Sequence, residues 1–154
     1  TQVGTLTSTQ VSKLTSAQIG ALSSTEIQAF TTTQANALTS TQLGSLTTTA
    51  VGKLSTTQVG ALTSTQVQGL TTTQLNAVVS DTLDAIDLTK LSTAQLSGLT
   101  TTSVTALTDT QIGTLTATQV GRLSSSQIGV LTSTHSPVAG SRTSIRPSIH
   151  LRCS

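Results

Sequence analysis

The stretch from Leu62 to Leu70, LTSTQVQGL, is one copy of an eight-residue pattern that recurs through most of the chain. Thr63 is followed three residues later by Gln66, which is the spacing of the capping box. In that motif the hydroxyl accepts a hydrogen bond from an amide in the first turn of a helix, and the Gln side chain accepts one from the capping residue's amide. Leu62 and Val67 occupy the positions of the hydrophobic staple, a second device that starts helices. The stretch therefore predicts a short helix that begins at Thr63.

The pattern keeps the same residue types at fixed positions in fourteen octads. The first position is always Thr or Ser, the fifth is always apolar, and the eighth is Leu except at Phe30 and Val78. Gln holds the fourth position in eleven octads, and the exceptions are Glu26, Ala50 and Ser103. Such regularity at a fixed period is the sequence signature of a repeat architecture.

The octads divide the chain into four parts. We predict a first array at residues 1–78, a degenerate repeat and register break at 79–91, a second array at 92–131, and a non-repetitive basic tail at 132–154. The break can be read as a degenerate octad that ends at Ile86 plus five further residues. It predicts either a loop that bulges from the stack or a slightly longer helix that interrupts it.

Each octad by itself favours a helix over a strand. Positions five and eight are three residues apart, which places them on one face of a helix, and strict apolar and polar alternation is absent. The abundant Thr favours strands instead, and Gly at position six costs a helix interior roughly 1 kcal/mol relative to Ala. Because helices below about 12 residues are marginal in water, only stacking can hold them. We therefore predict an all-α repeat solenoid of very short capped helices, one per octad, with a β-solenoid as the alternative.

Composition and motifs exclude most chemistry. Charged residues make up 8% of the chain and aromatic residues 1%, and the formal net charge is +2. No run of 18 apolar residues predicts a membrane span, and the recurring glycines never form a phosphate-binding loop. A nucleophilic Ser or Thr needs a positioned base, and no octad contains His. We predict no enzyme activity, no cofactor, no small-molecule substrate and no nucleic-acid partner.

Three acidic residues, Asp81, Asp84 and Asp87, are concentrated in the break. Carboxylates are the usual ligands of Ca²⁺, but the calcium-loop pattern with its central Gly and terminal Glu is missing. A solvated irregular turn is the simpler interpretation. The sequence therefore predicts no metal site.

The basic tail at 132–154 carries residue types that the octads lack. It contains both histidines, both prolines, three arginines and the single cysteine, which are His135, His150, Pro137, Pro147, Arg142, Arg146, Arg152 and Cys153. Without aromatic residues between them, the arginines do not form a pattern typical of nucleic-acid binding. A single cysteine cannot build a disulfide framework within the chain.

Residues 6–131 repeat one nine-letter pattern: Leu, Thr or Ser, two variable residues, Gln or Glu, an aliphatic residue, a variable residue, a small residue and Leu. This pattern resembles the octapeptide-repeat arrays of large bacterial secreted or surface proteins of the adhesin-like kind. The resemblance implies an extracellular or cell-surface setting and a spacer, stalk or filament role. The haem-binding role also attached to such arrays finds no His, Cys or Met ligand among the octads. The Thr content further resembles that of ice-binding solenoids, which display rows of Thr.

These observations lead to two functional hypotheses. The first is a non-enzymatic structural module, a rigid spacer or filament-forming segment. Because a solenoid exposes its apolar interior at an uncovered end, we expect end-to-end self-association or packing against neighbouring repeats of the same protein. The alternative is a Thr-rich hydroxyl surface that binds ice, a glycan or another polymeric partner.

Overall fold

A computed structural model describes residues 2–78 and 80–134 of the chain. Across these residues it contains fifteen α-helices, two 3-10 turns and no strand. The predicted all-α solenoid of short capped helices is therefore confirmed, and the β-solenoid alternative finds no support. No helix among the described residues has both the length and the apolar character needed to cross a membrane.

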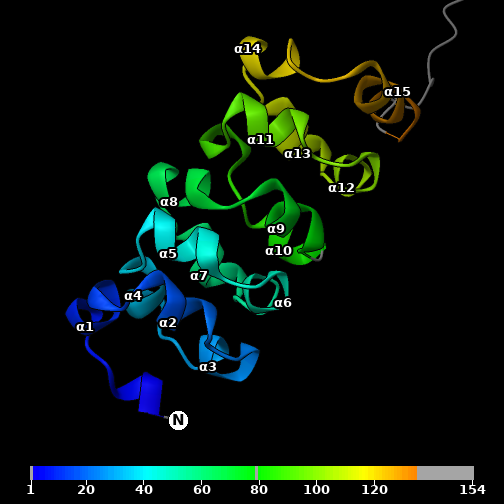
Figure 1. The fold of residues 1–154 in the computed structure, drawn as a ribbon. Helices are drawn as coiled ribbons and strands as arrows, with labels where there is room; N and C mark the ends of the chain where they lie inside the picture. The colour runs from blue at the N-terminus through cyan, green and yellow to red at the C-terminus, as the bar shows by residue number, and fades with distance from the viewer. Residues whose placement is uncertain (1, 79, 135–154) are drawn as a thin grey trace, which may run out of the picture.

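The elements stack in three columns along the solenoid (Figure 1). The first column contains α1 (Ser8–Lys13), α4 (Thr32–Asn36), α7 (Thr56–Gly60), α10 (Ser80–Asp84), α12 (Thr101–Thr105) and α15 (Ser125–Thr134). The second column contains α2 (Ser16–Gly20), α5 (Ser40–Ser45), α8 (Ser64–Gly69), η2 (Leu88–Lys90) and α13 (Asp109–Gly113). The third column contains η1 (Gln2–Thr5), α3 (Ser24–Gln28), α6 (Thr48–Val51), α9 (Thr72–Ala77), α11 (Thr93–Ser97) and α14 (Ala117–Val120).

Three consecutive elements complete one superhelical turn, which we call a coil. Helix α4 packs on α1, α5 on α2 and α6 on α3, so each helix lies against the one three places before it. The capping residues Thr7 of α1 and Thr31 of α4 are consequently 24 residues apart. Successive coils carry the chain from η1 at one end to α15 at the other (Figure 1).

A single continuous core runs through the coils. It is built from the fifth and eighth positions of the octads, and both members of the predicted staple, Leu62 and Val67, are buried in it. Lys53, at position seven of its octad, is exposed. The inward and outward positions predicted from the octad are therefore confirmed.

The break at 79–91 forms neither a bulging loop nor a longer helix, so both interpretations of its shape are wrong. Helix α10 takes the next place in the first column, and the 3-10 turn η2 packs on α8 in the second. Leu83 and Leu88 of these elements are fully buried in the common core. The five residues 87–91 thus form a shortened unit, and this coil has 21 residues between the capping residues Thr71 and Ser92.

Glycines permit the closest approach between helices in the second column. A Cβ atom added at Gly44 would lie 2.7 Å from the carbonyl oxygen of Gly69. One added at Gly69 would lie 2.6 Å from the Cα and Cβ atoms of Ser40 and still closer to its carbonyl oxygen. Only a residue without a side chain fits between α5 and α8 at these two points. This confirms the expected role of small residues at positions six and seven for this pair of helices.

Candidate functional site

The repeated feature of this chain is the fourth-position side chain of the octad, and we call the set of these side chains the glutamine ladder. Gln66 illustrates the first half of its chemistry. Its amide nitrogen of the main chain donates to the Thr63 hydroxyl at 3.4 Å, and its side-chain Oε1 accepts from the Thr63 amide at 2.9 Å. The predicted capping box is therefore present, and it satisfies backbone amides that the first turn of a helix leaves without partners.

The second half of the chemistry joins successive coils. The Nε2 atom of Gln74 donates to the carbonyl oxygens of Leu43 at 2.9 Å and Leu46 at 2.7 Å, which lie in the coil before it. Gln74 is 2% exposed, so these hydrogen bonds are shielded from water. One buried amide thus caps its own helix with its oxygen and bridges to the preceding coil with its nitrogen.

The bridge recurs along the stack. Nε2 donates to a carbonyl 25 or 28 residues earlier, at the eighth position that precedes the underlying element, in nine described side chains: Gln34, Gln42, Gln58, Gln66, Gln74, Gln95, Gln111, Gln119 and Gln127. Sequence reasoning found only the capping half of this arrangement. The available signal was the strong preference for Gln, because a capping box accepts Glu equally well and only Gln can also donate.

Two octads without Gln obtain substitutes from other residues. In the shortened unit, Lys90 stands at the fourth position, and its Nζ donates to the carbonyl oxygen of Leu62 at 2.7 Å, as a ladder Gln would. In α12, Ser103 stands at the fourth position, and its hydroxyl lies 2.9 Å from Oδ1 of Asn76. The same Oδ1 accepts from the amide of Thr100, which a ladder Gln would otherwise satisfy.

Glu26 marks a limit of the ladder. Its carboxylate accepts from the amide and the hydroxyl of Ser23, both at 2.8 Å, and these hydrogen bonds hold the pKa of Glu26 below its usual value against a small opposing effect of desolvation. A carboxylate has no hydrogen to donate to a carbonyl. Glu26 therefore performs the capping half of the role without the bridge.

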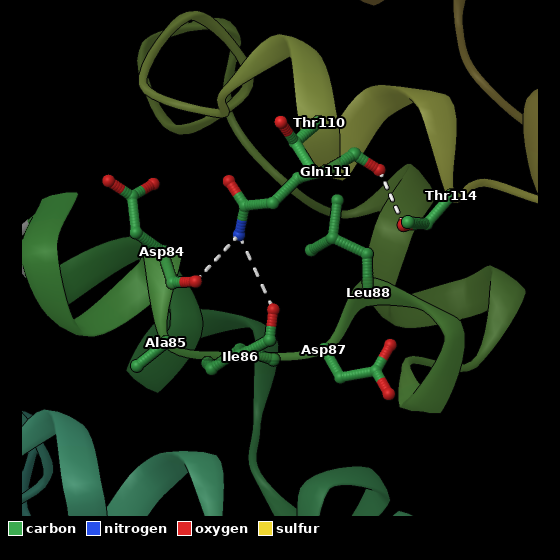
Figure 2. Close-up of a pocket in the computed structure, with 8 residues that line it drawn as sticks. All are labelled: Asp84, Ala85, Ile86, Asp87, Leu88, Thr110, Gln111 and Thr114. Atoms are coloured by element: carbon green, nitrogen blue, oxygen red, sulfur yellow. Dashed lines mark hydrogen bonds between the residues drawn. The ribbon is translucent and has the colours of Figure 1, made fainter.

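The acidic break does not form a cation site. Asp84 and Asp87 line a shallow depression with Gln111, and Figure 2 shows their carboxylates pointing away from each other. Gln111 Nε2 fills the space between them by donating to the carbonyl oxygens of Asp84 and Ile86, both at 3.3 Å. A hydrogen bond from the Thr89 hydroxyl is the main cause that lowers the pKa of Asp87. The side chain of Asp81 lies outside the described part of the structure.

No group of three or more His, Cys, Asp or Glu side chains that could hold a metal ion occurs among the described residues. The tail residues singled out in the sequence, the histidines, arginines and Cys153, lie beyond residue 134 and outside the described residues.

Comparison with known proteins supports a repeat array. A family model described as the ALTTAQ repeat matches residues 11–48 and 40–72, all within the first array. The chain is a helical repeat protein. The six letters of the family's description correspond to positions seven, eight and one to four of our octad, which residues 61–66 fill with ALTSTQ. The comparisons with curated proteins and with solved structures give no match.

Proposed function

We propose that this chain is a non-enzymatic structural module, a rigid spacer or filament-forming segment of an extracellular or cell-surface protein. The observation that carries the proposal is the contact pattern, in which each helix packs on those three places before and after it. In such a one-dimensional stack every added octad lengthens the molecule without enlarging its cross-section. The extracellular setting rests on the resemblance to adhesin-like octapeptide arrays.

The glutamine ladder supports rigidity. A stack held only by apolar contacts could slide between neighbouring positions, because apolar attraction is not directional. Hydrogen bonds from each buried Gln to specific carbonyls of the preceding coil fix the position of one coil on the next. The ladder therefore supplies the directional contacts that a spacer of defined length needs.

The hydroxyl-surface alternative gains less support from the geometry. First-position hydroxyls such as that of Thr63 are engaged in capping their own helices. Helices also pack about 8 to 10 Å apart, which is a coarse spacing for matching a fine lattice. The exposed second and third positions do carry hydroxyls, so binding to ice or glycans stays a measurable alternative.

Duplication of one complete coil tests the spacer role. Residues 47–70 comprise α6, α7 and α8, and a second copy inserted after Leu70 adds one coil with its own ladder side chains. We expect the maximum dimension from small-angle X-ray scattering of the monomer to increase by about 8 to 10 Å, the packing distance of helices, with helical content per residue unchanged.

A scrambled insertion of the same 24 residues at the same site is the matched control. We expect it to form a loop that lowers the thermal midpoint and leaves the long axis unchanged. A duplicated coil that behaves like the scrambled one would contradict the spacer proposal.

A further inference from the structure

The two faces at which coils meet are chemically different, and the fifth-position side chains show this first. In the first coil Val11 and Ile19 are completely buried by the coil that follows. In the last described helices the same position holds Val120, which is 43% exposed, and Ile128, which is 37% exposed. These are the two large apolar side chains that the described residues leave exposed. A fifth-position side chain therefore points toward the coil that comes next.

Backbone acceptors lie on the same face. Ladder side chains bind the eighth-position carbonyls that precede the helices beneath them, as Gln127 binds that of Leu99 at 2.8 Å. The equivalent carbonyls beside Val120 and Ile128 are those of Leu115 and Leu123. No described side chain donates to either of them. We call this surface, which contains Val120, Ile128 and these two carbonyls, the acceptor face.

The opposite face presents the matching donors. Gln10 and Gln18 are exposed, and each holds its Oε1 on the amide of its own capping residue at 2.8 Å, which fixes the direction of the side chain. Their Nε2 atoms bind no described residue, whereas the Nε2 atoms of ladder residues further along bind carbonyls. We call this surface, which contains Gln10 and Gln18, the donor face.

We propose that two copies of this chain associate head to tail, with the donor face of one on the acceptor face of the other. In this arrangement Gln10 of one copy donates to the Leu115 carbonyl of the other, and Gln18 donates to the Leu123 carbonyl. Val120 and Ile128 become covered as Val11 and Ile19 are. The joint continues the interface already present between coils of one chain, so the superhelix passes from copy to copy.

The same geometry excludes symmetric joints. Two donor faces would place amide nitrogens against each other, and two acceptor faces would leave carbonyls without hydrogen-bond donors. An interface between unlike faces does not close on itself when the superhelix advances, so repeated association gives an open filament. This inference rests on the proposed filament-forming role and specifies its partner and polarity.

Complementary variants that each block one face provide the test. Gln10→Glu with Gln18→Glu removes the donors, and the capping boxes survive because Glu26 caps in the same way. Val120→Asp with Ile128→Asp places charges on the acceptor face, at positions that are already partly exposed. Circular dichroism checks that both double variants keep the helical content of the parent chain.

The measurement is sedimentation velocity of the full 154-residue chain over a range of concentrations, in a reducing buffer so that Cys153 cannot form cross-links. We expect the parent chain to form a concentration-dependent series of oligomers and each double variant to stay monomeric. Mixed in equal amounts, the two variants should form a one-to-one dimer and nothing larger, because each retains one open face.

Gln28→Glu is the matched control, since it adds a negative charge on an exposed side chain that is not part of the ladder. It should associate like the parent chain. A monomeric parent, double variants that associate as strongly as the parent, or a mixture that stays monomeric would each overturn the head-to-tail joint. None of these results would affect the coil-duplication measurement, which is made on monomers.

Discussion

The hydroxyl of Thr63 satisfies an amide in the first turn of α8, whereas Thr65, two residues later, lies exposed in the helix and caps nothing. Thr63→Ala should therefore lower the free energy of unfolding by about 0.5 to 2 kcal/mol, and Thr63→Asp should be tolerated because Asp also caps. Thr65→Ala should be neutral or slightly stabilising, since Ala has the higher helix propensity. Thermal denaturation of the three variants provides the measurement, and equal losses for both Ala variants would contradict the assigned roles.

The second half of the ladder chemistry can be separated from capping by comparing Gln74 with Gln10. Both residues form a capping box, but only Gln74 also donates to carbonyls of the preceding coil. Gln10→Ala should lose the cap alone, about 1 kcal/mol. Gln74→Ala should lose a further 1 to 3 kcal/mol or so, because it leaves a buried carbonyl without a partner. Similar unfolding free energies for the two variants would show that the bridge contributes nothing.

Glu26 makes stability depend on pH. Because folding lowers its pKa from 4.5, its ionised form stabilises the fold above that pH, and this contribution disappears as the pH falls through the lower value of the folded state. Gln caps without titrating, so Glu26→Gln should remove this part of the dependence. We expect the thermal midpoints of the parent and the variant to change differently as the pH drops below about 4.5. Parallel curves would argue against the Ser23 hydrogen bonds.

The sequence predicts these side chains unequally well. Thr63, Gln66 and the buried pair Leu62 and Val67 could all be assigned within one octad, because a capping box and a staple are local motifs. The Nε2 bridge could not, since its carbonyl acceptors lie 28 or more residues earlier and their identity depends on how the coils stack.

At the scale of an element, Gly69 and Gly113 occupy different environments in the same column. Gly69 of α8 meets Ser40 of α5, whereas nothing lies within 4 Å of a Cβ atom added at Gly113. Gly69→Ala should destabilise by about 1 to 3 kcal/mol because the two helices must separate. Gly113→Ala should stabilise by up to about 1 kcal/mol through helix propensity. Chemical denaturation of both variants checks the prediction, and a gain for Gly69→Ala would refute the close approach.

The elements themselves were predictable except in the break. Each octad carries its own start signal, so the helices follow from local sequence. Residues 87–91 lack the Thr and Gln spacing, and only the tertiary contacts show that Asp87 caps η2 and that Lys90 supplies the bridge. A long, flexible Lys side chain can reach the carbonyl that a ladder Gln reaches elsewhere.

At the scale of the whole molecule, the number of octads per coil could not be predicted. All octads carry nearly the same pattern, so the sequence does not say which one packs on which. The division of the chain at residues 78, 91 and 131 likewise stays a prediction. The three-octad coil follows from long-range contacts alone, such as those between α2, α5 and α8.

Equivalence of the octads has a measurable consequence. Deletion of residues 55–62 removes one complete octad with α7, and every later helix then packs on a neighbour from another column. Because the octads share one pattern, we expect the variant to stay helical with a lower thermal midpoint. Deletion of residues 55–58 alone should disrupt the fold, since it removes the cap and the ladder side chain but leaves half an octad. Circular dichroism during heating distinguishes the two, and an equally stable half-octad deletion would contradict the repeat as the folding unit.

The shortened unit at 87–91 bears on how such a gene can change. Slippage of the copying machinery on a repetitive template adds or removes whole repeats, and a slip of eight codons keeps the reading frame and delivers an octad that already carries its cap and its apolar positions. The descendant protein differs in reach while the chemistry of every joint is inherited intact. The five-codon unit shows that even an imperfect event survives when Asp87, Leu88 and Lys90 restore a cap, a buried side chain and a bridge. Length is therefore a trait on which selection can act in small steps, without the protein having to find a new fold.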